Sequence, residues 1–139
     1  MEQRDLYLLE DQYGYQLRRA VQRYQAIFAR LIPGLTTMQF AALVRLDQQG
    51  AMSQNHLGRV ASMDAATVKG VVGRLETLGL VARHADPDDK RRLTVDITPE
   101  GRALVGRTYA PAVKAMEEGL APLTPSERLT LMALLSRLT

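Results

Sequence analysis

Residues 62–98 read SMDAATVKGVVGRLETLGLVARHADPDDKRRLTVDIT, and the pattern of this stretch decides the fold. Apolar residues recur in its first half at intervals of three and four, as in an amphipathic helix. These residues are Val68, Val71, Val72, Leu75 and Leu78. Asp64 or Ser62 can cap the start of this helix, and Gly79 can end it. The pattern predicts a helix over 62–78 with one face in a core and the other offered to a partner.

A β-hairpin is predicted after the glycine. Residues 80–84 form its first arm, and in the second arm Leu93, Val95 and Ile97 alternate with polar residues at period two. The tip at 85–92, ADPDDKRR, combines turn-forming residues with three consecutive cations. Charge alone leaves two interpretations of the tip open, a solvated turn or a wing that contacts phosphates.

Composition limits the classes of function. A chain of 139 residues fits one domain, or one domain with a helical appendage. The absence of Cys excludes disulfides and Cys-based zinc sites, and no cofactor or metal is expected. With no secretion signal and no apolar run of membrane-spanning length, we expect a cytoplasmic protein without a membrane partner. A net charge of +3 is compatible with nucleic acid, whereas 5% aromatics and no Trp argue against a stacking platform for single strands.

A long helix is predicted before the decisive stretch. Its three-to-four rhythm runs over 6–32 and ends at Pro33 and Gly34. The apolar surface exceeds what a lone helix can hide, so we expect packing against another long helix, in this chain or in a second copy. Its arginines are expected to be solvated, with one or two drawn inward to pair with an acid. They are Arg18, Arg19, Arg23 and Arg30.

Two shorter helices lie between that helix and residue 62. Thr36 or Thr37 can cap one that ends near 49, and Ser53 can cap another over 54–60. Together with the helix over 62–78 they make a helix-turn-helix, and the hairpin makes it winged. In such a unit the last helix lies in the major groove, while the wing reaches the DNA backbone or the minor groove.

The remainder of the chain is predicted to be helical. Thr98 and Pro99 open a helix to about 120 that is bent at Pro111, and the capping box TPSE at 124–127 opens a last helix. The fold class is therefore mainly α with a small β-hairpin. We divide the single chain 1–139 into a winged helix-turn-helix lobe at 36–98 and flanking dimerisation helices at 5–32 and 99–138.

Several motifs strengthen this interpretation. They are Asp64-x-x-Thr67, Leu75-Glu76-x-x-Gly79-Leu80-Val81, and Asp86-Pro87-x-Asp89-x-Arg91 running into Ile97-Thr98-x-x-Gly101. In this order they resemble the multiple-antibiotic-resistance regulator (MarR) family of bacterial transcription factors. The resemblance implies a homodimer with interlocked terminal helices and two lobes on a pseudo-palindromic operator of double-stranded DNA. It also implies repression that is relieved by a small aromatic carboxylate or phenolic effector, or its CoA thioester.

The run LEDQYGYQLRR at 9–19 also looks like a subgroup that controls aromatic-acid catabolism, including nicotinate and hydroxycinnamate breakdown. In this family the natural cavity is expected between the first helix and the DNA-binding lobe. An arginine there can hold a carboxylate through two hydrogen bonds, and a histidine can bind a ring nitrogen or hydroxyl. Alternatively, His56 is a surface or capping residue and the arginines form intersubunit salt bridges. The ligand candidates are Tyr13, Gln16, Arg18, Arg19, His56 and Met63.

The resemblance also assigns DNA contacts. It places Thr67 and Lys69 toward the groove and Arg74 at a phosphate. It places Arg91 in the minor groove, with Asp89 orienting its guanidinium. The full candidate set is Gln54, Asn55, Ser62, Asp64, Ala65, Ala66, Thr67, Lys69, Gly70, Arg74, Asp89, Lys90, Arg91 and Arg92.

One feature departs from the family pattern, since Gly70 and Gly73 stand where relatives carry larger polar residues. Each glycine costs about 1 kcal/mol of helix stability relative to Ala. In one interpretation, the two glycines merely weaken the helix and are tolerated. In the other, they allow the helix backbone to approach DNA closely, and Ala65 and Ala66 offer methyl contacts to thymine. Few side chains remain for base contacts, so we expect much of the specificity to come from wing insertion and DNA shape.

Two other classes of function compete with a DNA-binding regulator. An enzyme is not indicated, because Ser53, His56 and Asp64 do not form a triad by helical spacing alone. The chain also has no nucleophile elbow, phosphate loop or His-Glu-x-x-His site. A winged-helix protein-interaction module without an effector is the remaining alternative.

Overall fold

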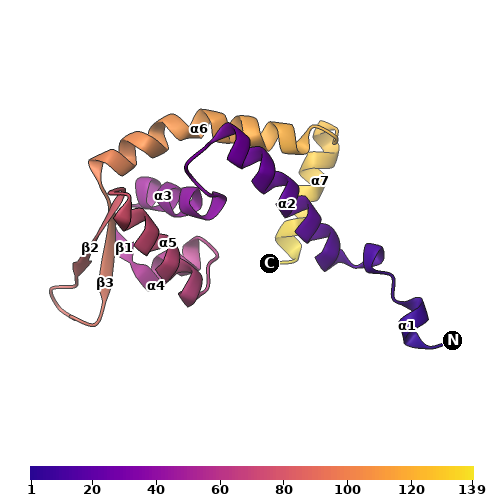
Figure 1. Ribbon diagram of the computed structural model, residues 1–139, viewed down its shortest axis with the longest axis horizontal. Helices are drawn as coiled ribbons and strands as arrows, with labels where there is room; N and C mark the ends of the chain where they lie inside the picture. Colours follow the sequence, from indigo (N-terminus) through magenta and orange to yellow (C-terminus); the bar gives the residue numbers. More distant parts are fainter. The chain divides into compact units, whose positions relative to one another are not determined.

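The computed structural model describes residues 1–139 and divides into two compact units (Figure 1). One unit, the lobe, spans Gly34–Ala110, and the other, the terminal unit, combines Met1–Pro33 with Pro111–Thr139. Helix α6 (Pro99–Leu120) contributes to both units, and Pro111 lies inside it at their boundary. No helix has the length and apolar character that crossing a bilayer requires.

The lobe has the predicted winged helix-turn-helix order. Helices α3 (Thr37–Gln49), α4 (Gln54–Val60) and α5 (Ala65–Thr77) are followed by strands β2 (Val81–Ala85) and β3 (Leu93–Ile97). The two strands form an antiparallel hairpin, which projects from the lobe in Figure 1. The mainly α fold class with a small β-hairpin is confirmed.

Capping side chains fix where the lobe helices start. The Thr36 hydroxyl accepts from the Gln39 N–H at 3.1 Å, and the Gln39 side chain accepts from the Thr36 N–H at 3.0 Å. At α5, the Asp64 carboxylate accepts from the Thr67 N–H at 2.7 Å. Of the alternatives that the sequence left open, Thr36 and Asp64 are the caps. Ser62 lies before the helix in a left-handed conformation, with φ of 56°.

The core of the lobe lies between the helices and the sheet. Its largest fully buried side chains are Leu43, Leu46, Leu57, Val68, Val72, Leu75, Val95 and Val105. The predicted apolar face of α5 is thus confirmed for most of its length, but Leu78 is 45% exposed. Leu78 is the C-cap residue, where the chain leaves the helix, so it no longer follows the helical period.

A third strand was not predicted. Strand β1 (Met52–Ser53) pairs with β3, giving the antiparallel order β1-β3-β2. Two residues are too short to show the period-two alternation on which strand prediction depends. This strand joins the start of α4 to the wing through β3.

The terminal unit corrects the prediction of one helix over 6–32. The chain instead forms α1 (Gln3–Leu6), a 3-10 turn η1 (Leu9–Asp11) and α2 (Tyr13–Leu31). Most of a helix's stability in a protein comes from packing of its apolar face, and no residue of α1 or η1 is buried. Leu6, Tyr7, Leu8 and Leu9 are moreover a continuous apolar run without helical period.

Arginines organise the remainder of the terminal unit around the end of α6. Arg23 on α2 donates to the Gly119 carbonyl at 2.6 Å, and Arg30 pairs with the Glu118 carboxylate. One arginine of this helix, Arg30, pairs with an acid as predicted, but its side chain stays 58% exposed and is not drawn inward. From helix α7 (Pro125–Arg137), which opens on the predicted capping box at Thr124, Arg128 donates to the Leu120 carbonyl at 3.1 Å.

Candidate nucleic-acid interface

Helix α5 presents a polar face opposite its buried one. The sequence candidates Ala65, Ala66, Lys69, Gly70 and Arg74 are all exposed, and Thr67 is partly buried. Neither Lys69 nor Arg74 makes a side-chain hydrogen bond or ion pair within the chain. Both cations are therefore available to an external anion.

The cap of α5 is anionic at neutral pH. Hydrogen bonds from the Thr67 backbone N–H and hydroxyl hold the pKa of the Asp64 carboxyl below its ordinary value, because they favour the charged form. The carboxylate satisfies one of the free amides at the start of the helix.

A tight turn sets the angle between α4 and α5. The Met63 N–H donates to the Gly58 carbonyl at 2.7 Å, and a Cβ at Gly58 would lie 3.0 Å from the Met63 oxygen and 3.2 Å from Val68. Only glycine allows the two helices to approach this closely at no steric cost. Ser62, in the same turn, adopts its left-handed conformation without a glycine's freedom.

The wing tip is an ordered turn rather than a free loop. The Asp86 N–H donates to the Arg92 carbonyl at 2.9 Å, and the Arg92 N–H donates to the Asp89 carbonyl at 3.0 Å. The Asp86 carboxylate accepts from the Asp88 N–H at 2.9 Å. Asp86 through its carboxylate and Asp89 through its carbonyl thus hold the turn together.

Asp89 and Arg91 form the pair that the resemblance implies. The Asp89 carboxylate accepts from the Arg91 N–H at 3.0 Å and from its Nε at 3.4 Å. The Arg91 side chain remains 94% exposed. Lys90 makes no ion pair, and Arg92 reaches Asp86 only at 4.0 Å. The tip therefore directs cationic groups outward although its acids and bases balance in number.

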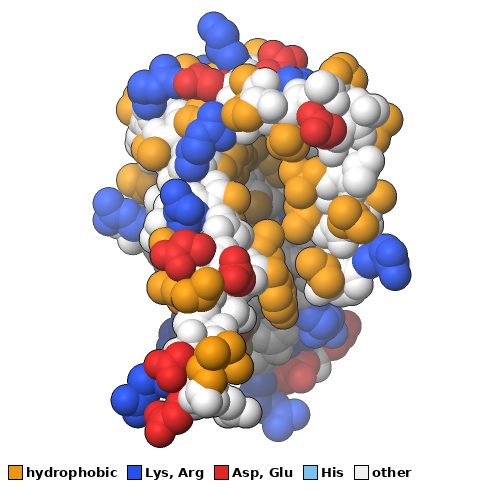
Figure 2. Space-filling view, turned by 90° about the vertical axis from the view of Figure 1, so that its right-hand side faces the viewer, with side chains coloured by type: hydrophobic (Ala, Val, Ile, Leu, Met, Phe, Trp, Pro, Cys, Tyr) orange, Lys and Arg blue, Asp and Glu red, His pale blue; other side chains and the backbone are white.

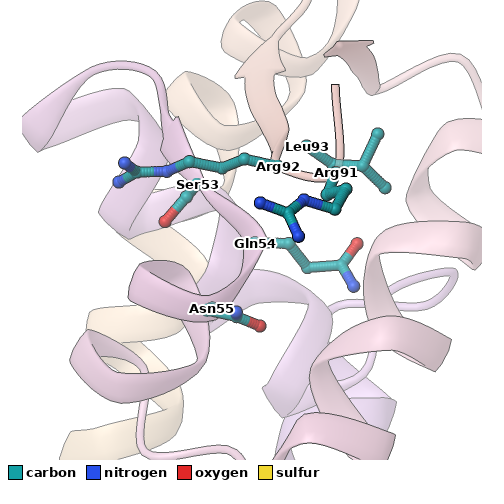
Figure 3. A pocket seen from close by; sticks show the side chains of 6 residues that line it. All are labelled: Ser53, Gln54, Asn55, Arg91, Arg92 and Leu93. Carbon is teal, nitrogen blue, oxygen red and sulfur yellow. The ribbon is translucent and has the colours of Figure 1, made fainter. Parts of the chain in front are cut away.

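A shallow pocket of about 100 Å³ lies where the wing meets the start of α4. In Figure 3, Gln54 and Asn55 form one wall, and Arg91 and Arg92 extend from the wing on the other. The Gln54 Oε1 is buried without a hydrogen-bond partner. The structure thus brings together Gln54, Asn55, Arg91 and Arg92, four of the candidates for DNA contact.

The six ligand candidates fall on both compact units. Tyr13, Gln16, Arg18 and Arg19 lie on α2 of the terminal unit, whereas His56 on α4 and Met63 before α5 belong to the lobe.

Their local partners differ. The Arg19 guanidinium lies 5.7 Å from the centroid of the Tyr15 ring, and Gln16 donates its amide to the Glu10 carbonyl at 2.7 Å. Tyr13 is 73% exposed. The His56 ring lies 3.4 Å from an Arg59 nitrogen.

Comparison with known proteins identifies the family. The MarR family model matches residues 35–93. The transcriptional repressor NicR of Pseudomonas putida is 35% identical over 134 residues, which cover 95% of this chain and 85% of NicR. A probable transcriptional regulator from Pseudomonas aeruginosa has a crystal structure with 52% identity and a TM-score of 0.88, covering 95% of this chain and all of that one.

A third relative is regulated by a small aromatic acid. Bordetella bronchiseptica BpsR, whose DNA binding is regulated by 6-hydroxynicotinic acid, is 40% identical with a TM-score of 0.88. That alignment covers 95% of this chain and 96% of BpsR. The matches to NicR and to the two structures extend over nearly the whole sequence, and the family model matches the winged lobe, so the chain belongs to the MarR family of transcriptional regulators.

Proposed function

We propose that this protein is a homodimeric repressor that binds a pseudo-palindromic operator through α5 and the wing and is released by a small aromatic acid or its CoA thioester. The observation that carries the proposal is the outward cationic surface of the lobe. Lys69 and Arg74 on α5 and Lys90 on the wing have no internal partner, and Arg91 is almost fully exposed.

These groups suit the two parts of a duplex. Cations without internal partners can neutralise phosphates, which carry much of the affinity for DNA. A protruding arginine fits the narrow minor groove, whose negative potential attracts guanidinium groups. We assign Arg91 to the minor groove, with Asp89 orienting it, and the pocket residues Gln54, Asn55 and Arg92 to the adjacent backbone.

The exposed face of α5 is assigned to the major groove. Thr67 and Lys69 are assigned to its base contacts, and the methyl groups of Ala65 and Ala66 offer contacts to thymine. Gly70 leaves room for the helix backbone to approach the duplex. Ser62 and Asp64, at the start of the helix, are assigned to the same edge of the interface.

Dimerisation is supported by apolar surface on the terminal unit. MarR regulators bind operator DNA as dimers. Helix α7 buries no residue in the single chain, and the terminal unit exposes several large apolar side chains. They include Leu6, Leu8, Tyr13, Val21, Val113, Met116, Leu129, Met132 and Leu138. Figure 2 shows hydrophobic side chains gathered on the face that lies to the right in Figure 1. A patch this extensive is typical of an interface, and a second copy would cover it.

The effector class is supported by the relatives and by α2. BpsR responds to 6-hydroxynicotinic acid, which carries a carboxylate on an aromatic ring. Arg18 and Arg19 offer guanidinium groups that can hold a carboxylate, and Tyr13 and the oxygen of the Gln16 amide can bind a ring hydroxyl. His56 and Met63 complete the proposed site from the lobe.

Release follows from differential binding. A ligand shifts an equilibrium only by as much as it prefers one conformation over another. An effector bound between the dimer helices and the lobe would move the two recognition helices away from the spacing of about 34–36 Å that successive major grooves require. The operator affinity would then fall.

A mobility-shift titration against the DNA upstream of the gene tests the DNA-binding proposal. We expect tight binding to one site and a loss of affinity as salt rises. Arg91→Ala should lower operator affinity tenfold or more without unfolding the dimer. Arg107→Ala, which removes an exposed arginine from α6 of the same lobe, is the matched control. Wild-type protein that binds no specific DNA would instead favour a protein-interaction module.

A second titration tests the effector. Hydroxynicotinate, hydroxybenzoates and hydroxycinnamates, or their CoA thioesters, are added to the protein–operator complex, with benzene derivatives lacking the carboxylate as controls. At least one acid should dissociate the complex, and Arg18→Gln should reduce that response while operator binding persists. Unchanged operator binding with every acid would contradict the aromatic-effector proposal.

A further inference from the structure

A charged residue stands on the core-facing side of the wing. Arg83 on β2 pairs directly with Val95 on β3, and directly paired residues of an antiparallel sheet point to the same face. Val95 is fully buried, and Val81, two residues before Arg83, is buried on that face as well. The alternation of core-facing and outward-facing residues along β2 would place an apolar residue at 83. Because burying an unpaired charge is costly, the arginine requires a specific partner there.

Glu76 of the recognition helix is that partner. The Arg83 Nη2 donates to the Glu76 Oε1 at 2.8 Å, and the Arg83 Nε donates to the Oε2 at 3.2 Å. This two-bond geometry fixes the orientation of both groups as well as their separation. The same hydrogen bonds lower the pKa of the Glu76 carboxyl, so the pair is ionised at neutral pH.

The pair is the last side-chain tie between the hairpin and α5 before the wing tip. From His84 to Leu93 every residue except Asp86 is exposed, and the tip's own hydrogen bonds join only tip residues. Arg91 thus lies at the far end of a hairpin whose angle to α5 is fixed by the hydrophobic core and, further out on the same face, by the Glu76–Arg83 pair.

We propose that Glu76 and Arg83 are positioning residues that hold the wing at the angle to α5 at which Arg91 and the recognition helix engage DNA together. The inference rests on the proposed operator binding, to which it adds two residues that need not touch DNA. A partly exposed ion pair contributes little to the free energy of unfolding. Its main effect here is on orientation, because it joins the two elements assigned to the grooves.

The inference makes a distinctive prediction about coupling. Glu76→Gln keeps the side chain's size but removes the charge that orients Arg83. We expect it to lower operator affinity about fivefold or more while leaving the melting temperature within a few degrees of wild type. In protein that already carries Arg91→Ala, the same substitution should change affinity less than twofold, because the wing has lost the group that Glu76 positions.

A four-protein cycle measures this coupling. Operator affinity is determined by fluorescence anisotropy for wild type, Glu76→Gln, Arg91→Ala and the double variant, with a thermal melt of each. Arg83→Lys, which keeps the charge but not the two-bond geometry, should resemble Glu76→Gln. The reversed pair, Glu76→Arg with Arg83→Glu, should recover most of the affinity that Glu76→Gln loses.

The outcomes separate the two proposals. Equal losses from Glu76→Gln in both backgrounds, or no loss in either, overturn the positioning role while operator binding stands. The positioning role is also overturned if the variants lose operator affinity in proportion to a large drop in melting temperature, because such a drop indicates damage to the fold. If the wild-type protein binds no operator, the proposed function fails, and the positioning role fails with it.

Discussion

Gly101 occupies the most crowded glycine position in the lobe, and its replacement by alanine should be strongly destabilising. A Cβ there would lie 2.1 Å from the Leu80 carbonyl oxygen and 2.9 Å from the Ile97 side chain. The Leu80 oxygen already accepts the Thr98 N–H at 3.0 Å. The added methyl would therefore meet backbone, which cannot turn aside as a flexible side chain can.

The cost can be estimated from these contacts. Ordinary van der Waals contact begins near 3.4 Å, so the methyl group and the Leu80 oxygen must separate by about an ångström. Forcing extra volume into a packed site costs about 1–3 kcal/mol. Losing the hydrogen bond from Thr98 would cost about 1 kcal/mol more, and alanine's better helix propensity returns up to about 1 kcal/mol. With the full return from helix propensity, we expect a net loss of about 1–3 kcal/mol.

Urea unfolding followed by circular dichroism measures this loss, at one fixed protein concentration because the proposed dimerisation would add to apparent stability. Gly106→Ala is the matched control. It lies on the same helix, where an added Cβ would have no neighbouring atom within 4 Å, and should gain about 1 kcal/mol. If Gly101→Ala were as stable as Gly106→Ala, the close approach of α6 to the start of the wing would be refuted.

Three further outcomes are expected. Ser62→Gly should stabilise the protein by about 0.5–1 kcal/mol in urea unfolding, because the relief of a left-handed serine exceeds the entropy cost of glycine. Gly70→Ala should add about 1 kcal/mol of helix stability. The operator affinity of Gly70→Ala then distinguishes the two interpretations of this glycine. An unchanged affinity indicates that Gly70 only weakens the helix, whereas a lower affinity indicates that the helix backbone approaches DNA closely at this position. Asp64 and Glu76 have lowered pKa values when folded, so their stabilisation is present above their ordinary values of 3.8 and 4.5 and is lost as pH falls through the folded ones. Unfolding measured from pH 7 to pH 3 should show this loss, and Glu76→Gln should reduce it.

Much of the lobe could be predicted because its signals are local. Helical period, capping residues and turn formers stand next to one another in the sequence, as at Thr36 and Ser53, and each specifies its own element. The terminal unit was harder to predict. Whether an apolar run such as residues 6–9 joins a helix depends on the surface that covers it, and in the single chain no surface does.

The site shows the same difference between local and long-range information. The Asp89–Arg91 contact spans two residues and follows from a motif. The Glu76–Arg83 contact joins a helix to a strand across the Gly79 turn. Glu76 could not be named as the partner of Arg83 before the positions of both elements were known. A signal was nonetheless present, since Arg83 interrupts the alternation that Val81 begins.

The wing tip shows why a charge count misjudges such a surface. The three acids Asp86, Asp88 and Asp89 are as many as the three cations that follow them. This balance of charge, taken alone, argues against a DNA contact. The carboxylates of Asp86 and Asp89, however, accept backbone N–H groups within the turn. Acids held in this way lie close to the backbone, whereas the Arg91 guanidinium extends into solvent. The field that a polyanion meets is set by the outermost charges, so acids that build the turn make the tip more able to present a cation.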